Sequence, residues 1–214
     1  MTGRHIRADA GRPSSGPVDD RSLPVIVVTG TSGAGKGTLE AEVMPRVPEL
    51  ELAVSATTRE RRAGERDGRE YYFIDQAEFQ RRLDAGEFLE HVDFEWGQRS
   101  GTLWSEIDRI RAKGKAPLLD LETDGALAVQ REIPDSVTIF VKAPTFAELE
   151  RRLRERATES GGEIEKRLAR AKAQLQQADQ FDHVIVNDDV ERAADELLAI
   201  VERELHRAGT MSRP

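Results

Sequence analysis

The chain has 214 residues, of which 38% are hydrophobic and 34% charged, and its formal net charge at pH 7 is −8. This composition is typical of a globular domain in water, and the negative charge argues against nucleic acid or an anionic membrane surface as the main partner. The absence of cysteine excludes a disulfide scaffold and a cysteine nucleophile, and the histidines lack the spacing of a zinc site.

The first predicted elements follow a polar segment. Residues 1–22 mix Arg, Asp, Gly, Pro and Ser without an apolar core, so we expect a disordered tail rather than a secretory signal. Residues 23–30, LPVIVVTG, form a β-branched run that ends in glycine and predicts a buried strand. A helix is predicted from residue 35 to about 46. No apolar run approaches a membrane span, and the expected location is the cytoplasm.

The rest of the chain alternates between apolar runs and helical patterns. Residues 51–101 are irregular, with a helix predicted at 76–85. Further strands are predicted at 116–122, 136–141 and 183–188, and helices at about 103–113, 124–131, 145–157, 163–179 and 189–207. This order predicts an α/β fold with a mostly parallel sheet. Ligands of such sheets bind at the carboxyl ends of the strands, where Gly30, Asp120, Glu122 and Asn187 fall.

The segment GTSGAGKGT, residues 30–38, has the pattern of a phosphate-binding loop. Its glycines let backbone N–H groups surround phosphate oxygens, and Lys36 neutralises the β- and γ-phosphates. The strict pattern has a magnesium-binding hydroxyl directly after the lysine, but here Gly37 stands there and Thr38 follows. Thr38 lies about 100° further around the helix, so we expect it to reach magnesium through water. The alternative is an ordinary glycine-rich turn.

A basic stretch, SATTRERRAGERDGREYYF, covers residues 55–73. Arg59 and Arg62 lie three residues apart, and Tyr71 follows a glycine-containing turn. Arginine forks match phosphate oxygens in pairs, so these side chains predict a second phosphate site. The alternative is a solvated charged loop.

This stretch resembles guanylate kinase, as SATTRxxRxGExxGxxYxF, and the resemblance covers about residues 24–205. EFLEH (87–91) is similar to the family's guanine-contacting strand, RLRERATES (152–160) and EIEKRLARAKAQL (163–175) to its lid, and VIVNDD (184–189) to its adenine-pocket strand. The resemblance implies a P-loop kinase three-layer fold over 23–208, with a GMP-binding lobe at about 55–102, a helical lid at about 152–170, and a tail at 209–214.

The resemblance also implies the reaction ATP + GMP to ADP + GDP, with Mg²⁺ and with dGMP as a second acceptor. The implied ATP-binding residues are Gly30, Thr31, Ser32, Gly33, Ala34, Gly35, Lys36, Gly37 and Thr38, with Asn187 near adenine. The implied GMP-binding residues are Ser55, Arg59, Arg62, Tyr71, Glu90, Thr102 and Glu122. The implied lid and catalytic cations are Arg152, Arg156 and Arg167, together with Lys36.

These residue types suit that chemistry. A carboxylate only accepts hydrogen bonds, so Glu90 would pair with the N–H groups on the edge of guanine, and Glu122 with the remaining amino proton. The acceptor phosphate is already anionic, so we expect catalysis by positioning and cationic screening, without a general base. Asp120 is assigned to magnesium-bound water or to orienting an arginine. Arg151 and Arg154 are interpreted as a solvated helix face.

The sequence departs from the family in two places. Ser100 replaces a tyrosine that gives the GMP phosphate a second phenol, and one residue is inserted near Glu95. Adjacent Arg99 is a candidate to compensate. Asp124 replaces a glutamine and adds negative charge near the substrate. These changes concern GMP affinity and base selectivity more than phosphoryl transfer.

Two other functions stay open at this point. One is a related small-molecule phosphokinase, such as one acting on ribose 1,5-bisphosphate, which would leave Glu90 and Glu122 without a base to recognise. The other is a catalytically silent interaction module of guanylate-kinase type, which would not need Lys36 and its glycines. The sequence does not indicate an oligomeric state.

Overall fold

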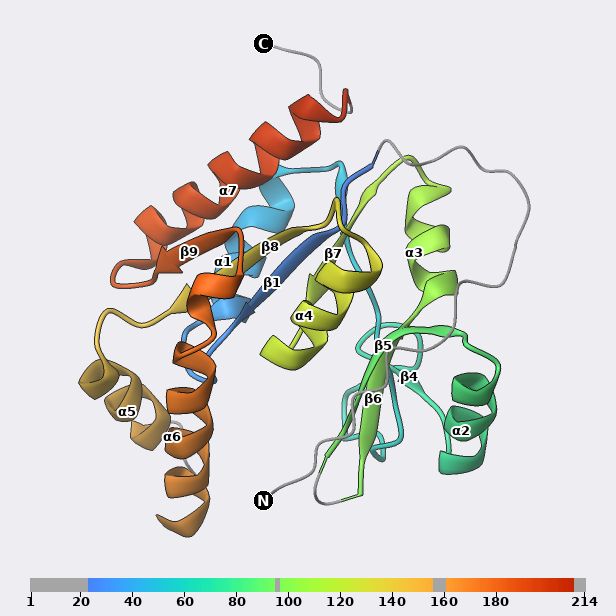
Figure 1. Cartoon of the computed structure of the whole chain (residues 1–214), viewed down its shortest axis with the longest axis horizontal. Coiled ribbons are helices and arrows are strands. Elements are labelled where there is room, and N and C mark those ends of the chain that lie inside the picture. Colours follow the sequence, from blue (N-terminus) through green and yellow to red (C-terminus); the bar gives the residue numbers. More distant parts are fainter. Residues whose placement is uncertain (1–22, 95–96, 156–160, 210–214) are drawn as a thin grey trace.

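A computed structural model describes residues 23–94, 97–155 and 161–209, and its main sheet has the strand order β2-β7-β1-β8-β9 (Figure 1). The strands are Leu50–Leu52 (β2), Ala116–Asp120 (β7), Ile26–Gly30 (β1), Val137–Lys142 (β8) and His183–Val186 (β9). All neighbours in this sheet are parallel. The expected mostly parallel sheet of an α/β fold is therefore confirmed.

Helices cover both faces of this sheet and give the protein three layers. They are Lys36–Val43 (α1), Val190–Arg207 (α7), Trp104–Arg111 (α3) and Thr123–Glu132 (α4). Side chains of a strand alternate between faces, so Ile26 and Val28 pack with α1 and α7, whereas Val27 packs with α3 and α4. The central strand β1 is buried on both faces, as its β-branched run predicts.

A smaller sheet lies beside the main one, with the order β4-β3-β6-β5. Its strands are Tyr72–Phe73 (β4), Ala56–Thr57 (β3), Arg99–Leu103 (β6) and Phe88–Asp93 (β5). Helix α2, Gln76–Asp84, buries Phe79 against it, and the side chain of Asp75 caps this helix by accepting from the Glu78 N–H. The sequence predicts residues 51–101 to be irregular apart from one helix, and this prediction missed the smaller sheet. Strands this short show no clear alternation of apolar and polar residues.

The two sheets are joined by the buried carboxylate of Glu106 on α3, which is 2% exposed. One of its oxygens accepts from the Val54 N–H at 2.9 Å, and the other accepts from the Tyr72 hydroxyl at 3.0 Å. Arg109 pairs with both oxygens at 2.6 and 2.8 Å. These contacts hold the smaller sheet at a fixed place relative to the main sheet.

A helical pair occupies the other side of the carboxyl ends of the main strands (Figure 1). Helix α5 is Phe146–Glu155 and helix α6 is Gly161–Leu175. They share a separate apolar cluster that includes Leu149, Leu153 and Leu168. The helix predicted at 163–179 thus ends earlier, and a 3₁₀ turn, Ala178–Gln180, follows it. Likewise, α1 ends at Val43 and passes into a 3₁₀ turn at Met44–Arg46 that contains Pro45.

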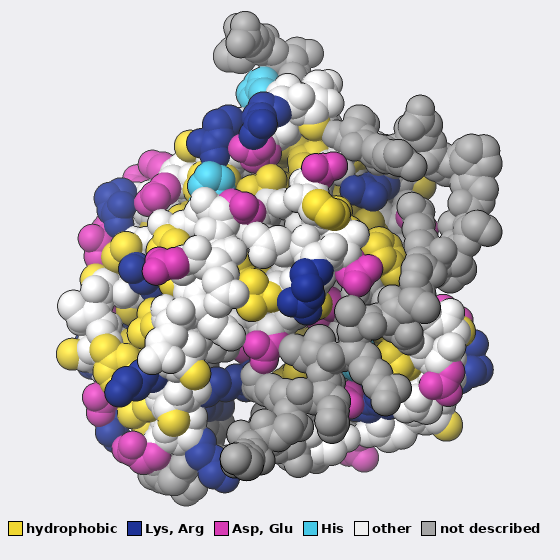
Figure 2. Space-filling view, viewed as in Figure 1, with side chains coloured by type: hydrophobic (Ala, Val, Ile, Leu, Met, Phe, Trp, Pro, Cys, Tyr) yellow, Lys and Arg dark blue, Asp and Glu magenta, His cyan; other side chains and the backbone are white. Residues whose placement is uncertain are grey.

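None of the helices within the described ranges is both long enough and apolar enough to span a bilayer. On the face shown in Figure 2, cationic and anionic side chains are interspersed.

Candidate active site

The glycine-rich loop connects β1 to α1 at the carboxyl edge of the main sheet. Gly35 precedes the helix with a φ of +92°, and a Cβ at this position would lie 2.5 Å from the side-chain nitrogen of Asn187. That nitrogen donates to the carbonyl of Ala34 at 2.7 Å. Glycine is therefore required at position 35 for both conformation and space. The loop has the strand–loop–helix context that its sequence predicts for a phosphate site.

Acidic side chains surround the loop lysine. The Lys36 Nζ lies 3.9 Å from Oδ1 of Asp120, because Lys36 begins α1 directly after the loop that follows β1, and Asp120 ends the adjacent strand β7. Glu40, one turn after Lys36, is 6% exposed, and burial together with the charge of Asp120 raises its pKa to about 8. Sequence reasoning missed Glu40. The available signal was a glutamate beside Leu39 on the face of α1 that packs on the sheet.

Of the three predicted lid arginines, the structure describes Arg152 and Arg167. Arg152 on α5 donates from Nε to Glu148 at 2.8 Å and from NH2 to the backbone oxygen of Asn187 at 3.0 Å. This contact brings α5 to the end of β9 and therefore to the loop that Asn187 holds. Arg167 is half-buried on α6. Arg156 lies outside the described residues.

Arg151 and Arg154, interpreted from sequence as solvated, pair with acidic residues of the helical pair. Arg151 contacts Glu148 and Glu155, and Arg154 contacts Glu150. Both arginines have about half of their side-chain surface exposed, at 56% and 48%.

Glu90 on β5 is a buried carboxylate whose two oxygens have different surroundings. Oε1 accepts from the backbone N–H and the hydroxyl of Thr102, both at 2.8 Å. A Cβ on Gly125 of α4 would lie 2.8 Å from Oε2, so the glycine leaves room for this oxygen. Burial raises the pKa of Glu90 to about 7, against the two bonds from Thr102. Glu90 and Thr102, both among the predicted GMP-binding residues, lie in contact.

Glu122 precedes α4 and is held from the opposite side by α6. Its Oε2 accepts from the side-chain amide of Gln174 at 2.7 Å and pairs with NH2 of Arg170 at 3.0 Å. Neither Gln174 nor Arg170 was predicted from the sequence as a site residue. The only signal was their spacing of four residues, which places them on one face of a helix. Asp124, the second departure from the family pattern, lies in the first turn of α4.

The basic stretch forms a loop organised by Glu65. Arg59 donates from both terminal nitrogens to this carboxylate, at 3.0 and 2.8 Å, and the Arg62 backbone N–H donates to it at 2.7 Å. These donors lower the pKa of Glu65 to about 2. The Arg59 guanidinium also lies 5.2 Å from the ring centre of Tyr71. The Ser55 carbonyl accepts from the Tyr72 N–H at 2.9 Å, which ties the start of this stretch to β4.

Ser100 and Arg99 face opposite sides of β6. The Ser100 hydroxyl donates to the carbonyl of Ala56 at 2.9 Å. Arg99 instead donates to Asp93 and to Gln80, both at 2.8 Å, and lies over the ring of Phe79. The structure therefore does not place Arg99 where it could replace the missing phenol, because its side chain is held against α2. The inserted residue near Glu95 falls outside the described residues.

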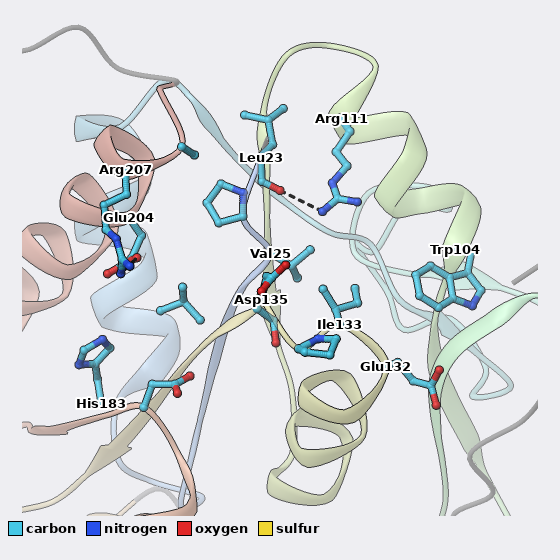
Figure 3. A pocket seen from close by; sticks show the side chains of 16 residues that line it. Leu23, Val25, Trp104, Arg111, Glu132, Ile133, Asp135, His183, Glu204 and Arg207 are labelled. Carbon is cyan, nitrogen blue, oxygen red and sulfur yellow. Dashed lines mark hydrogen bonds and ion pairs between the residues drawn. The ribbon is translucent and has the colours of Figure 1, made fainter. Parts of the chain in front are cut away.

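A cavity of about 960 Å³ opens at the amino end of the main sheet (Figure 3). Leu23 and Val25 line it before β1, with Arg111 from the end of α3 and Arg207 from the end of α7. The residues that line it include none of the predicted site residues. The candidate site is therefore the carboxyl edge, where the glycine-rich loop, Asp120, Glu122 and Asn187 meet.

Known proteins similar to this chain are guanylate kinases. The family model for guanylate kinase matches residues 22–204. Guanylate kinases of Symbiobacterium thermophilum and Rubrobacter xylanophilus are 43% and 44% identical to this chain. The alignments cover 86% of both chains for the first, and 84% of this chain and 93% of the relative for the second.

A solved structure is also similar. The crystal structure of guanylate kinase from Anaplasma phagocytophilum superimposes with a TM-score of 0.66 at 30% identity, over 85% of this chain and 86% of that one. Sequence, fold and the arrangement of the carboxyl edge lead to one conclusion. The chain belongs to the guanylate kinase family.

Proposed function

We propose that this protein is an ATP:GMP phosphotransferase that converts GMP, and dGMP, to the diphosphate. The observation that carries this assignment is the buried carboxylate of Glu90, one oxygen of which is occupied by Thr102 while the other adjoins Gly125. A buried acceptor of this kind needs donors, and the N–H groups on the edge of guanine supply them. Family membership supports the same reaction.

ATP binds along the loop from Gly30 to Thr38 in this proposal, with its phosphates at the start of α1 and its adenine near Asn187. The helix N-terminus and the backbone N–H groups favour phosphate there. The side-chain oxygen of Asn187 is buried and accepts no hydrogen bond within the described residues, which suits a donor such as the adenine amine.

GMP binds in the lobe formed by residues 55–102. The loop with Arg59, Arg62 and Tyr71 holds its phosphate, since guanidinium forks and a phenol are suitable donors to phosphate oxygens. Ser55 and Thr102 border the base, Glu90 accepts from its edge, and Glu122 takes the remaining amino proton. Glu65 orients the Arg59 fork.

Mg²⁺ fits the oxygen donors near Lys36. Magnesium prefers hard oxygen ligands and keeps several waters beside substrate phosphates, so the Thr38 hydroxyl and the Asp120 carboxylate suffice to hold it through water. Within residues 23–94, 97–155 and 161–209, no group of three or more Asp, Glu, His or Cys side chains is arranged to hold a metal ion by itself, and a magnesium shared with phosphates does not need one. The ion, when bound, supplies charge neutralisation between the phosphates.

Catalysis then depends on positive charge and on exclusion of water. Lys36 neutralises ATP phosphates, and Arg152, Arg156 and Arg167 act from a lid formed by residues 152–170. The separate apolar cluster of α5 and α6 supports a lid that moves as a unit. The reaction needs ATP and GMP, so we expect the protein to work in the cytoplasm.

A coupled assay of ADP release with Mg·ATP tests this proposal. GMP and dGMP should be turned over, whereas AMP, CMP and ribose 1,5-bisphosphate should be turned over far more slowly. Lys36→Met should remove activity with every acceptor and serves as the control for contaminating kinases. Turnover of ribose 1,5-bisphosphate without GMP, or none with any acceptor, would overturn the proposal and favour the sugar-phosphate kinase or the silent module.

A further inference from the structure

Two residues of α6 contact the same oxygen of Glu122, Oε2. Gln174 donates a hydrogen bond to it, and Arg170 forms an ion pair with it. We infer that Gln174 and Arg170 are positioning residues that set selectivity for the 2-amino group of guanine by fixing the Glu122 carboxylate. The inference rests on the proposed function, since it deepens the description of the GMP site. It adds a specificity contribution from α6, a helix outside the smaller sheet.

The geometry leaves the second oxygen of Glu122 available. The Gln174 amide lies 2.7 Å from Oε2 and the Arg170 NH2 lies 3.0 Å from the same atom. A carboxylate accepts at both oxygens, so the Gln174 hydrogen bond and the Arg170 ion pair on Oε2 leave Oε1 as the acceptor that remains. The Glu122 side chain is 38% exposed and without these contacts would rotate freely in water. The contacts therefore reduce the ordering cost of binding an amino group.

The environment of Gln174 indicates that its amide is there for this contact. The residue is 3% exposed, yet its side-chain oxygen is buried without a hydrogen-bond partner within the described residues. Burial of an unpaired polar oxygen is unfavourable, and an apolar side chain would pack at this position without that cost. The Nε2–Oε2 bond is the one interaction described for this amide that an apolar residue could not make.

Gln174 and Arg170 also connect the Glu122 carboxylate to the predicted lid. Gln174 and Arg170 lie one turn apart on α6, the same helix that carries Arg167. Glu122 lies directly before α4, whose Gly125 adjoins Glu90. The contacts of Gln174 and Arg170 therefore join α6, which carries Arg167, to Glu122, which accepts from the guanine amino group in the proposed complex.

Comparison of GMP with IMP tests the inference, because IMP keeps the N1–H and O6 of guanine but lacks the 2-amino group. We would measure kcat/KM for both acceptors in the wild type, Gln174→Met, Arg170→Met and Glu122→Gln. Lys172→Met is the matched control, since Lys172 is an exposed cation on the same helix. Thermal unfolding of each variant reports any general loss of structure, and Arg170→Met, at a half-buried site, keeps the test informative if Gln174→Met unfolds.

Gln174→Met should lower kcat/KM for GMP by about tenfold, which is the lower part of the range for one hydrogen bond to a charged group. Arg170→Met, which removes the ion pair, should lower it in the same direction, and both variants should leave the value for IMP unchanged. Combined with Glu122→Gln, Gln174→Met should cause no further loss of GMP over IMP selectivity, because both act through one carboxylate. Equal losses for GMP and IMP, or an unchanged ratio, would overturn the inference. A wild type that does not phosphorylate GMP would instead refute the proposed function.

Discussion

The buried carboxylate of Glu90 predicts a loss of activity toward GMP as the pH falls through neutrality. Burial raises its pKa to about 7, far above the ordinary value of 4.5. Two donors from Thr102 occupy Oε1, so a proton on Glu90 resides on Oε2. Protonated Oε2 would face the N–H donors of guanine with a donor of its own. We therefore expect the free enzyme to bind GMP only with Glu90 ionised, and the ionised fraction falls with falling pH.

The size of the effect follows from that pKa. Ionisation of a group with a pKa near 7 falls from about 97% at pH 8.5 to roughly 24% at pH 6.5, so kcat/KM for GMP should fall about fourfold. Titration of the GMP phosphate, with a pKa near 6, accounts for only about 1.3-fold over the same range. An ordinary glutamate would contribute about 1%.

The assay is kcat/KM for GMP at saturating Mg·ATP between pH 6.5 and 8.5. Glu90→Gln is the control: its lower residual activity should show only the shallow change from the phosphate. A wild-type profile that changes by no more than about 1.3-fold would refute the reasoning, because it would mean that Glu90 is ionised throughout or that its ionisation does not affect GMP binding.

Other features give three further predictions. Folded Glu40 binds its proton more tightly than the unfolded chain does, with a pKa of about 8. Its contribution to stability is therefore greatest at low pH and is lost as pH rises toward 8. Relative to Glu40→Gln, the wild-type unfolding free energy should fall by up to about 2.5 kcal/mol between pH 5.5 and 7.5, measured by urea denaturation; parallel profiles for the two proteins would contradict this. Ser100→Tyr should lower the KM for GMP by about tenfold by adding a donor to a charged phosphate, and Ser100→Phe, which has the ring without the hydroxyl, should not; equal effects of both would show that the hydroxyl is irrelevant. A Cβ at Gly37 meets nothing within 4 Å, so Gly37→Ser should fold normally and reduce the Mg²⁺ concentration for half-maximal rate relative to Gly37→Ala. If serine and alanine behave alike at position 37, the magnesium ion is not within reach of that site.

The main sheet and the candidate site at its carboxyl edge could be predicted because their signals are local. The run VIVV before the glycine loop is long enough to show a strand buried on both faces, and β1 is buried along its full length. Polar residues directly after apolar runs, such as Asp120 and Asn187, identify the carboxyl edge of a parallel sheet from order alone. The fold and the position of the candidate site therefore followed from short stretches of sequence.

The smaller sheet and the carboxylate contacts could not be predicted in the same way. Strands β3 and β4 each have 2 residues, too few to show an alternating pattern. The hydrogen bond from Gln174 to Glu122 joins residues 52 positions apart, and the sequence around either residue gives no sign of this contact. The prediction that Arg99 could compensate for Ser100 failed for a related reason. It relied on their adjacency in sequence, but adjacent side chains of a strand point to opposite faces.

The tie between Asn187 and Ala34 has a consequence for how the protein is made. It joins residues separated by 153 positions, and β1 itself pairs with β7 and β8, which are synthesised much later. At a synthesis rate of ~5–20 residues per second, the ribosome needs roughly 8–30 s to reach the residue that holds the loop in place. The loop sequence thus leaves the ribosome early but acquires its nucleotide-binding shape only when nearly the whole domain has emerged. Such distant pairings also make refolding slow compared with that of a helical bundle of similar size.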